Sequence, residues 1–163
     1  MLITFKFKNF KSFFDETILD MSASYDKSYK DINTFEVNEK LFKKKESHEL
    51  LKSALIFGAN ASGKTNVLKA MAYMKSAVLF SGMPNYNYNS NVINFAFYDY
   101  AKNEESLYEV DFIKNNSRYL YGFKIEKGVV KEEYLYQNAQ RKTEIFKRDN
   151  SGITIIGLKP EET

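Results

Sequence analysis

The chain has 163 residues, of which 44% are hydrophobic and 16% aromatic. This length and composition predict one globular domain with a buried core and exclude an intrinsically disordered chain. The 24 basic and 21 acidic residues nearly balance, which by itself does not predict nucleic-acid binding. Cysteine is absent, which excludes disulfides and thiolate metal sites, and the single histidine, His48, excludes a site with paired histidines.

The lysines are unevenly distributed along the chain. Lys6, Lys8 and Lys11 lie in a start that holds no acid, and a lysine run occupies 43–45. A solvated surface is the favoured interpretation, and a patch that faces phosphate or DNA is the alternative. The N-terminus lacks the apolar core of a signal peptide, and no apolar run reaches the length of a membrane span. We therefore expect a soluble cytoplasmic protein with no membrane partner.

The N-terminal part predicts a hairpin followed by a long loop. Residues 2–8 alternate between apolar and polar side chains, which is typical of a half-buried strand. Residues 9–12 predict a turn, and a second strand is expected within 14–21. The polar stretch 22–48 predicts a loop with one short element near 35–37.

A strand and a helix are predicted on either side of residue 58. Residues 50–57 end in a continuous apolar run, which predicts a strand buried on both faces. Residues 65–80 have the spacing of an amphipathic helix. Its expected core-facing stripe comprises Val67, Leu68, Met71, Ala72, Met74 and Val78.

The second half predicts a β-meander without crossover helices. Turn-forming residues fill 82–91, and the period then changes to two. Short separators make neighbouring strands antiparallel, and strands are expected at 108–113, 118–126, 129–136, 143–148 and 153–156. The predicted fold class is α/β (α+β): a P-loop strand-loop-helix unit on a partial sheet, an N-terminal hairpin and a C-terminal antiparallel β-meander.

The segment from Gly58 to Thr65 carries the one motif with specific chemistry. Its sequence, Gly-Ala-Asn-Ala-Ser-Gly-Lys-Thr, matches G-x-x-x-x-G-K-[ST] at every fixed position. At ordinary residue usage a random chain of this size matches less than about 1% of the time. The segment therefore predicts a P-loop, and the alternative is a glycine-rich turn that contains Lys-Thr without binding phosphate.

Each residue type in the motif suits polyphosphate. Gly58 and Gly63 allow close approach of the backbone, whose N–H groups form an anion-binding nest at the start of a helix. Lys64 is the predicted catalytic residue because its ammonium would lie on the β- and γ-phosphates. The Thr65 hydroxyl is the predicted Mg²⁺ ligand. We expect ATP with Mg²⁺ to be bound by Gly58, Ala59, Asn60, Ala61, Ser62, Gly63, Lys64, Thr65 and Asn66.

The motif alone does not make a complete hydrolase. Turnover also needs an acid that holds Mg²⁺ and a group that orients water, and no apolar strand ending in Asp follows the helix. A doubly wound P-loop sheet repeats βα units of roughly 30 residues or more, and only one is present. We therefore expect 1–163 to be a single incomplete P-loop ATPase domain, truncated or completed by another chain. It divides into a nucleotide-binding lobe at 1–80 and a β-meander subdomain at 92–157.

Two segments resemble a known family. Asn9-Phe10-Lys11-Ser12-Phe13, together with 52–70, resembles the opening of the ABC/SMC-like AAA-family ATPases of bacteria. These are similar to the ATPase heads of OLD-type nucleases and of several phage-defence systems. Residues 118–123 and 132–136 also resemble the β-rich insert of that group.

The resemblance implies heads that pair, with ATP between one P-loop and the signature segment of the other. It implies a homodimer or a partner ATPase or nuclease chain, with DNA as a further partner. It also implies that Lys11 and Ser12 lie near the nucleotide, and the alternative for Lys11 is a surface turn. The sequence departs from the group because the Mg²⁺ acid, the signature and the switch histidine are absent.

Three functions remain open from the sequence. The favoured one is the ATP-binding N-terminal lobe of an ABC/SMC-like ATPase that hydrolyses ATP once the missing elements complete it. The second is a non-hydrolysing interaction module or truncated fragment. The third is a small-molecule P-loop kinase, against which the meander argues because such kinases continue with βα crossovers.

Overall fold

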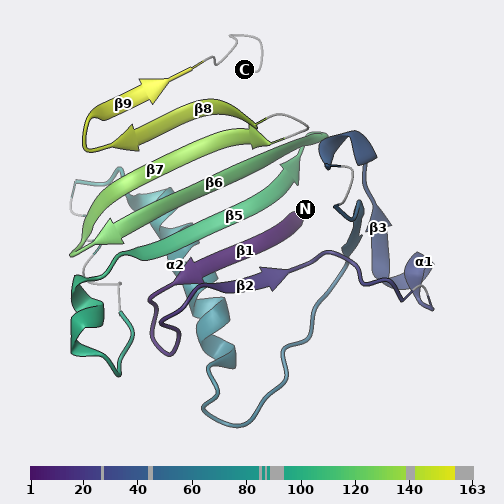
Figure 1. Cartoon of the computed structure of the whole chain (residues 1–163), viewed down its shortest axis with the longest axis horizontal. Helices are drawn as coiled ribbons and strands as arrows, with labels where there is room; N and C mark the ends of the chain where they lie inside the picture. Colours follow the sequence, from purple (N-terminus) through teal and green to yellow (C-terminus); the bar gives the residue numbers. More distant parts are fainter. Residues whose placement is uncertain are drawn as a thin grey trace.

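A computed structural model of the chain describes residues 1–26, 28–43, 46–84, 86, 88, 94–138 and 142–156. Its elements follow the chain as shown in Figure 1. The order is β1 (Leu2–Lys8), β2 (Thr17–Asp20), α1 (Lys30–Asn33), β3 (Thr34–Glu36), η1 (Glu39–Leu41), β4 (Glu49–Leu51), α2 (Lys64–Phe80), η3 (Asp99–Asn103), β5 (Ser106–Lys114), β6 (Ser117–Glu126), β7 (Val129–Asn138), β8 (Lys142–Asp149) and β9 (Gly152–Ile155).

One seven-stranded sheet organises the molecule. Its order is β2-β1-β5-β6-β7-β8-β9, and every neighbouring pair is antiparallel. The predicted hairpin, the meander and the mixed α/β class are therefore confirmed. The sequence did not show that β1 pairs with β5, which joins hairpin and meander into one sheet. The short element expected near 35–37 is β3, which pairs with β4 apart from the main sheet.

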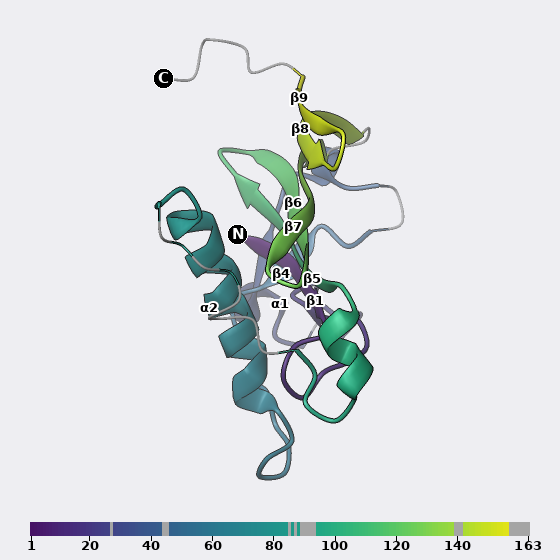
Figure 2. The same ribbon diagram turned by 90° about the vertical axis from the view of Figure 1, so that its left-hand side faces the viewer.

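Helix α2 packs against one face of this sheet (Figure 2). Alternation along β1 places Phe5 and Phe7 in the core, where they meet Tyr108 and the helix. Burial raises the pKa of the Tyr73 and Tyr108 hydroxyls, which have no hydrogen-bond partner in the described part of the chain. Both phenols are therefore neutral at physiological pH, and they pack as aromatic core residues.

The buried face of α2 differs from the predicted stripe. The buried residues are Val67, Ala70, Tyr73, Met74 and Ala77. Leu68, Ala72 and Val78 are exposed, so that half of the prediction is wrong. Val78 lines an open hollow between α2 and the sheet together with Met71 and Met74, and its side chain is exposed because the sheet does not cover it there. Periodicity shows which residues share a face of the helix, and it does not show how fully the sheet covers that face.

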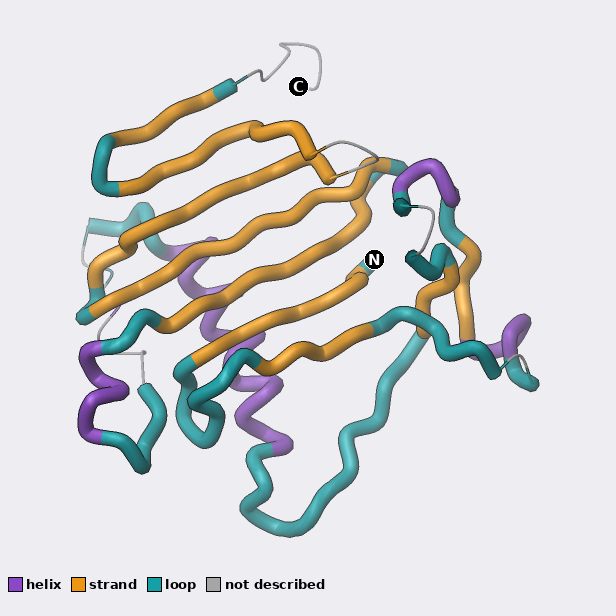
Figure 3. Tube along the Cα trace, viewed as in Figure 1, coloured by secondary structure: helices purple, strands orange, loops and turns teal. Residues whose placement is uncertain are grey.

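The predicted strand 50–57 is wrong beyond Leu51. Residues 53–57 form no strand, and they run as an extended loop from β4 towards α2 (Figure 3). The side chains of Leu55, Ile56 and Phe57 are 79%, 41% and 83% exposed. A strand needs a neighbour for its main-chain hydrogen bonds, and none of the described strands lies beside this segment. The apolar pattern is present without the sheet that would bury it.

Two other predicted segments are only partly described. The lysine run 43–45 includes two positions outside the described residues, and most of the predicted loop 82–91 also lies outside them. None of the helices in the described ranges combines the length and apolarity needed to cross a bilayer.

A buried ion cluster fixes the β3–β4 unit to the sheet. Arg118 of β6 and Asp111 of β5 are both buried, and the guanidinium donates to the carboxylate through Nε and Nη2, at 3.0 and 2.8 Å. Its Nη1 also donates to the main-chain oxygen of Leu41 and pairs with Glu46. Burial alone would raise the pKa of the Glu46 carboxyl, but Arg118 outweighs it and the pKa lies below its ordinary value.

Removing Arg118 leaves the buried Asp111 without its partner. We expect Arg118→Met to lower the free energy of unfolding by about 3–5 kcal/mol, measured by urea denaturation. The double variant Asp111→Leu/Arg118→Met removes both charges and is expected to recover part of that loss. Lys69→Met, at an exposed position of α2, is the control. A loss for Arg118→Met no larger than that of the control would contradict this assignment.

Candidate nucleotide-binding site

The predicted P-loop forms a turn that leads directly into α2. Residues 58–62 are exposed, and the loop projects past the sheet at the end where α2 begins (Figure 2). The N–H of Ser62 donates to the oxygen of Ala59 at 3.3 Å, and the N–H of Asn66 donates to the oxygen of Gly63 at 2.7 Å. These bonds close the loop and start the helix.

Gly63 is required at the junction between loop and helix. Its φ is +93°, in the left-handed region that favours glycine. A Cβ on Gly63 would also lie 2.6 Å from Ser12 Oγ and 3.1 Å from the Phe13 ring. Gly58 is less constrained, because a Cβ there would meet mainly the rotatable Ser62 hydroxyl. The side chains of the β1–β2 turn therefore leave no room for a Cβ at Gly63.

The Lys64 ammonium is folded back over its own loop. Nζ donates to the main-chain oxygens of Gly58 and Ala59, at 2.8 and 2.5 Å. The amides of Gly63, Lys64 and Thr65 have no acceptor among the described residues, as expected for the first turn of a helix. A cation and unpaired N–H groups at one helix start suit a polyphosphate. The residues present therefore fit the phosphates of a nucleotide.

Mg²⁺ would have to arrive with the nucleotide. Within the described ranges, no group of three or more His, Cys, Asp or Glu side chains is placed to hold a metal ion. The Thr65 side chain is exposed at the start of α2 and offers a hydroxyl oxygen. Mg²⁺ usually keeps several waters and binds one or two protein ligands together with substrate phosphates. A single hydroxyl beside the phosphates is consistent with that mode.

The β1–β2 turn brings Ser12 to the loop. Ser12 Oγ accepts a hydrogen bond from Asn66 Nδ2 at 2.9 Å and lies against Gly63. Lys11 has a φ of +53°, and its ammonium lies 5.6 Å from the ring centre of Phe10. The structure thus joins Ser12 and Asn66 at the helix start and places the Lys11 ammonium over an aromatic ring. Contact of Lys11 or Ser12 with a nucleotide stays a prediction.

Asn9 holds this turn in place, a role that its position in the sequence did not predict. It is fully buried, and its Nδ2 donates to the main-chain oxygens of Ala101 and Glu104, at 2.8 and 3.1 Å. Its Oδ1 accepts from the N–H of Phe95 at 3.0 Å. Asn9 also has a φ of +53°, which asparagine tolerates better than most residues. An asparagine at the end of a strand was the available signal.

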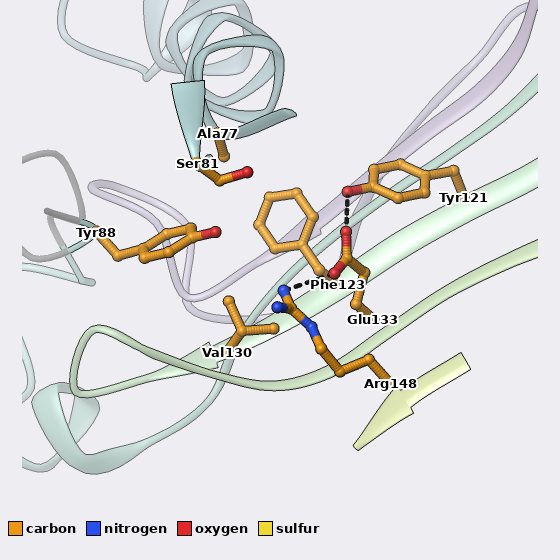
Figure 4. Close-up of a pocket in the computed structure, with 8 residues that line it drawn as sticks. All are labelled: Ala77, Ser81, Tyr88, Tyr121, Phe123, Val130, Glu133 and Arg148. Atoms are coloured by element: carbon orange, nitrogen blue, oxygen red, sulfur yellow. Dashed lines mark hydrogen bonds and ion pairs between the residues drawn. The ribbon is translucent and has the colours of Figure 1, made fainter. Parts of the chain in front are cut away.

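Two hollows elsewhere in the molecule are unsuited to binding a nucleotide. One, at the C-terminal end of α2, has a volume of about 10 Å³, room for a single water (Figure 4). Its Glu133 already accepts from the Tyr121 hydroxyl and pairs with Arg148. The other, of about 470 Å³ between α2 and the sheet, has a lining that is apolar except for Lys75. The first is too small for a triphosphate, and the second offers almost no polar group to bind one.

The geometry at Gly63 makes a stability prediction. We expect Gly63→Ala to destabilise the chain by about 1–3 kcal/mol, because alanine is strained at this φ and its Cβ meets Ser12. Gly82→Ala is the matched control, since a Cβ there meets nothing within 4 Å. Urea denaturation of both variants gives the comparison. Equal stability of the two would show that the approach of Gly63 to the turn is not tight.

Comparison with known proteins gives one family. Residues 53–160 match the family described as "AAA domain, putative AbiEii toxin, Type IV TA system". A search of curated proteins found no match. The matched range includes the whole P-loop, α2 and the meander. Since it covers more than half of the sequence, the chain belongs to this family of AAA domains, whose general function is nucleotide binding by a P-loop ATPase-like domain.

Proposed function

We propose that the chain is the ATP-binding N-terminal lobe of an ABC/SMC-like P-loop ATPase, which hydrolyses ATP when further elements complete it. The observation that carries the proposal is the start of α2. There the unpaired amides of Gly63, Lys64 and Thr65 meet the Lys64 ammonium at one exposed loop. Family membership supports nucleotide binding in general.

Nucleotide binding would change the hydrogen-bond acceptors of the Lys64 ammonium. Its ammonium now rests on the oxygens of Gly58 and Ala59, and the β- and γ-phosphates would replace them as acceptors. Loop amides from 59–63 and the helix start would hold the phosphate oxygens, and Asn66 and Ser12 would fix the geometry of the junction. Mg²⁺ held by Thr65 would neutralise charge on the β- and γ-phosphates. Lys64 is the proposed catalytic residue, through its contact with those phosphates.

The segment 53–57 supports the view that the lobe needs completion. No main-chain hydrogen bond joins these residues to another described residue, and their large apolar side chains are exposed. Apolar residues on both faces of an extended segment are typical of an interior strand of a parallel sheet. We propose that strands from a further segment or another chain pair with it, and that this sheet carries the Mg²⁺ acid and the water-orienting group.

The partners follow from the resemblance and from the family description. A second copy, or a partner ATPase or nuclease chain, would supply the signature segment across the nucleotide. DNA is a proposed further partner, and the family description names a toxin of a type IV toxin–antitoxin system. We propose a cytoplasmic role in defence against phage on that basis.

A binding module without hydrolysis is the second candidate. It is favoured by one observation: turnover needs an acid that holds Mg²⁺, and no group of acidic side chains placed to hold a metal ion is found within the described part of the chain. A small-molecule kinase is less consistent with the structure, because antiparallel strands follow α2 where a kinase would continue with parallel crossovers. Turnover by the completed assembly separates the two remaining candidates.

Lys64 provides the direct test of nucleotide binding. We expect Lys64→Ala to weaken Mg²⁺·ATP binding about tenfold or more, because a charge-assisted contact of roughly 1.5–3 kcal/mol is lost. Titration calorimetry measures the affinity, and urea denaturation should show little change in stability, because the hydrogen bonds that the ammonium makes to described residues are to its own exposed loop. Lys69→Ala, one turn further along α2, is the matched control. Equal affinity of wild type and Lys64→Ala would refute the site.

A further inference from the structure

Strand β9 is an exposed edge strand of the sheet. It lies at the end opposite β2, and no described strand pairs with its outer side (Figure 1). Residues 152–156 read Gly-Ile-Thr-Ile-Ile, with no charge and no proline, and Ile153 and Ile155 are each 65% exposed. Proteins commonly protect edges with charge, and β2 ends in Asp20 and follows Asp15-Glu16. Within residues 152–156 the β9 edge has no such protection.

The main-chain groups that face outward can be assigned. The N–H of Ile156 donates to the oxygen of Ile145 at 2.8 Å, so Ile156 points its main-chain groups towards β8. Hydrogen-bonding direction alternates along an antiparallel strand, so Thr154 also points towards β8. Ile153 and Ile155 therefore present their N–H and C=O groups to the free edge.

The side chains of these two isoleucines continue an apolar row across the sheet. The register pairs Ile155 with Phe146, Phe146 with Leu135 and Leu135 with Tyr121. Because cross-strand partners share a face, Ile155 lies on the face that α2 covers further along, and so does Ile153. Thr154 lies on the opposite face. Ile153 and Ile155 thus lie on one face, and Thr154 and Ile156 lie on the other.

We propose that β9 pairs antiparallel with β9 of a second copy, about a two-fold axis that lies between the two Thr154 residues. In this register Ile153 faces Ile155 of the second copy, and each such pair exchanges both of its main-chain hydrogen bonds. Thr154 faces its own counterpart at the intervening non-hydrogen-bonded position, where side chains are closest. The contacts are Ile–Ile pairs on one face and a Thr–Thr pair on the other, and both kinds stabilise antiparallel strands.

A second copy fits this edge because the edge is complementary to itself. Isoleucines placed symmetrically about Thr154, each with outward-facing main-chain groups, satisfy the condition that a two-fold interface sets. If the register shifted by one residue, an isoleucine would face Thr154, whose main-chain N–H and C=O groups point towards β8 and cannot bond across the interface. The isoleucine side chains would then also lie opposite side chains of the other face. The two sheets then form one continuous sheet, with both α2 helices on the same side. This pairing leaves the P-loop free and does not depend on nucleotide.

Charged substitutions at Ile153 and Ile155 test the proposed register. We expect the wild-type chain, without nucleotide, to show a concentration-dependent monomer–dimer equilibrium in sedimentation velocity. Ile153→Lys/Ile155→Lys and Ile153→Glu/Ile155→Glu should each be monomeric, because like charges then face each other across the axis. An equimolar mixture of the two variants should form a dimer, since every facing pair is then of opposite charge. Circular dichroism checks that both variants keep the fold, as their exposed positions lead us to expect.

Two further variants serve as controls. Ile18→Lys, on the exposed edge strand β2, should leave the dimer intact, and so should Lys64→Ala, which separates this pairing from any association through nucleotide. A wild-type chain that is monomeric at every concentration would overturn the proposal. Persistence of the dimer in both double variants would overturn it too, because the contact would then lie elsewhere. Failure of the mixed variants to associate would exclude the proposed register.

Discussion

The packing of α2 on the aromatic core of the sheet is the constraint on which the candidate site depends. Ala70 and Ala77 let the helix approach β1, β5 and β6, and the aromatic core forms between them. Because α2 begins at Lys64, this packing also fixes where the first helical amides point. A phosphate site made of main-chain N–H groups requires such rigidity, since the groups must converge before the ligand arrives. The packing of the core therefore fixes the geometry of the proposed anion-binding groups.

The β1–β2 turn provides the second support. Asn9 joins the end of β1 to the main chain near η3, from a fully buried position. Three residues later, Ser12 meets Gly63 and accepts from Asn66. A short turn thus connects the interior of the sheet to the loop, and the left-handed Gly63 lies against the side chains of Ser12 and Phe13. Stability of the turn and geometry of the loop are coupled through this contact.

The sequence predicted features that depend on local pattern and missed those that depend on neighbours. Alternation identified β1 and the meander strands, and the motif located the loop and the start of α2. The strand expected at 53–57 failed because apolar character shows only that a segment can be buried, and a strand also needs adjacent strands. Asn9 was missed because its value lies in distant main-chain partners, such as Ala101, that no local pattern reveals.

The two exposed apolar segments differ in what each requires. Along 53–57 the side chains on both faces are apolar, so stable burial needs neighbours at both edges and layers on both faces. Strand β9 already has β8 on one side, and its isoleucines lie on one face, so one further strand satisfies it. A second copy can provide that strand by symmetry, but pairing at β9 supplies no strand for 53–57, which lies between β4 and α2 and is not part of the main sheet. Completion of the ATPase core and pairing at β9 therefore involve different segments, and one does not require the other.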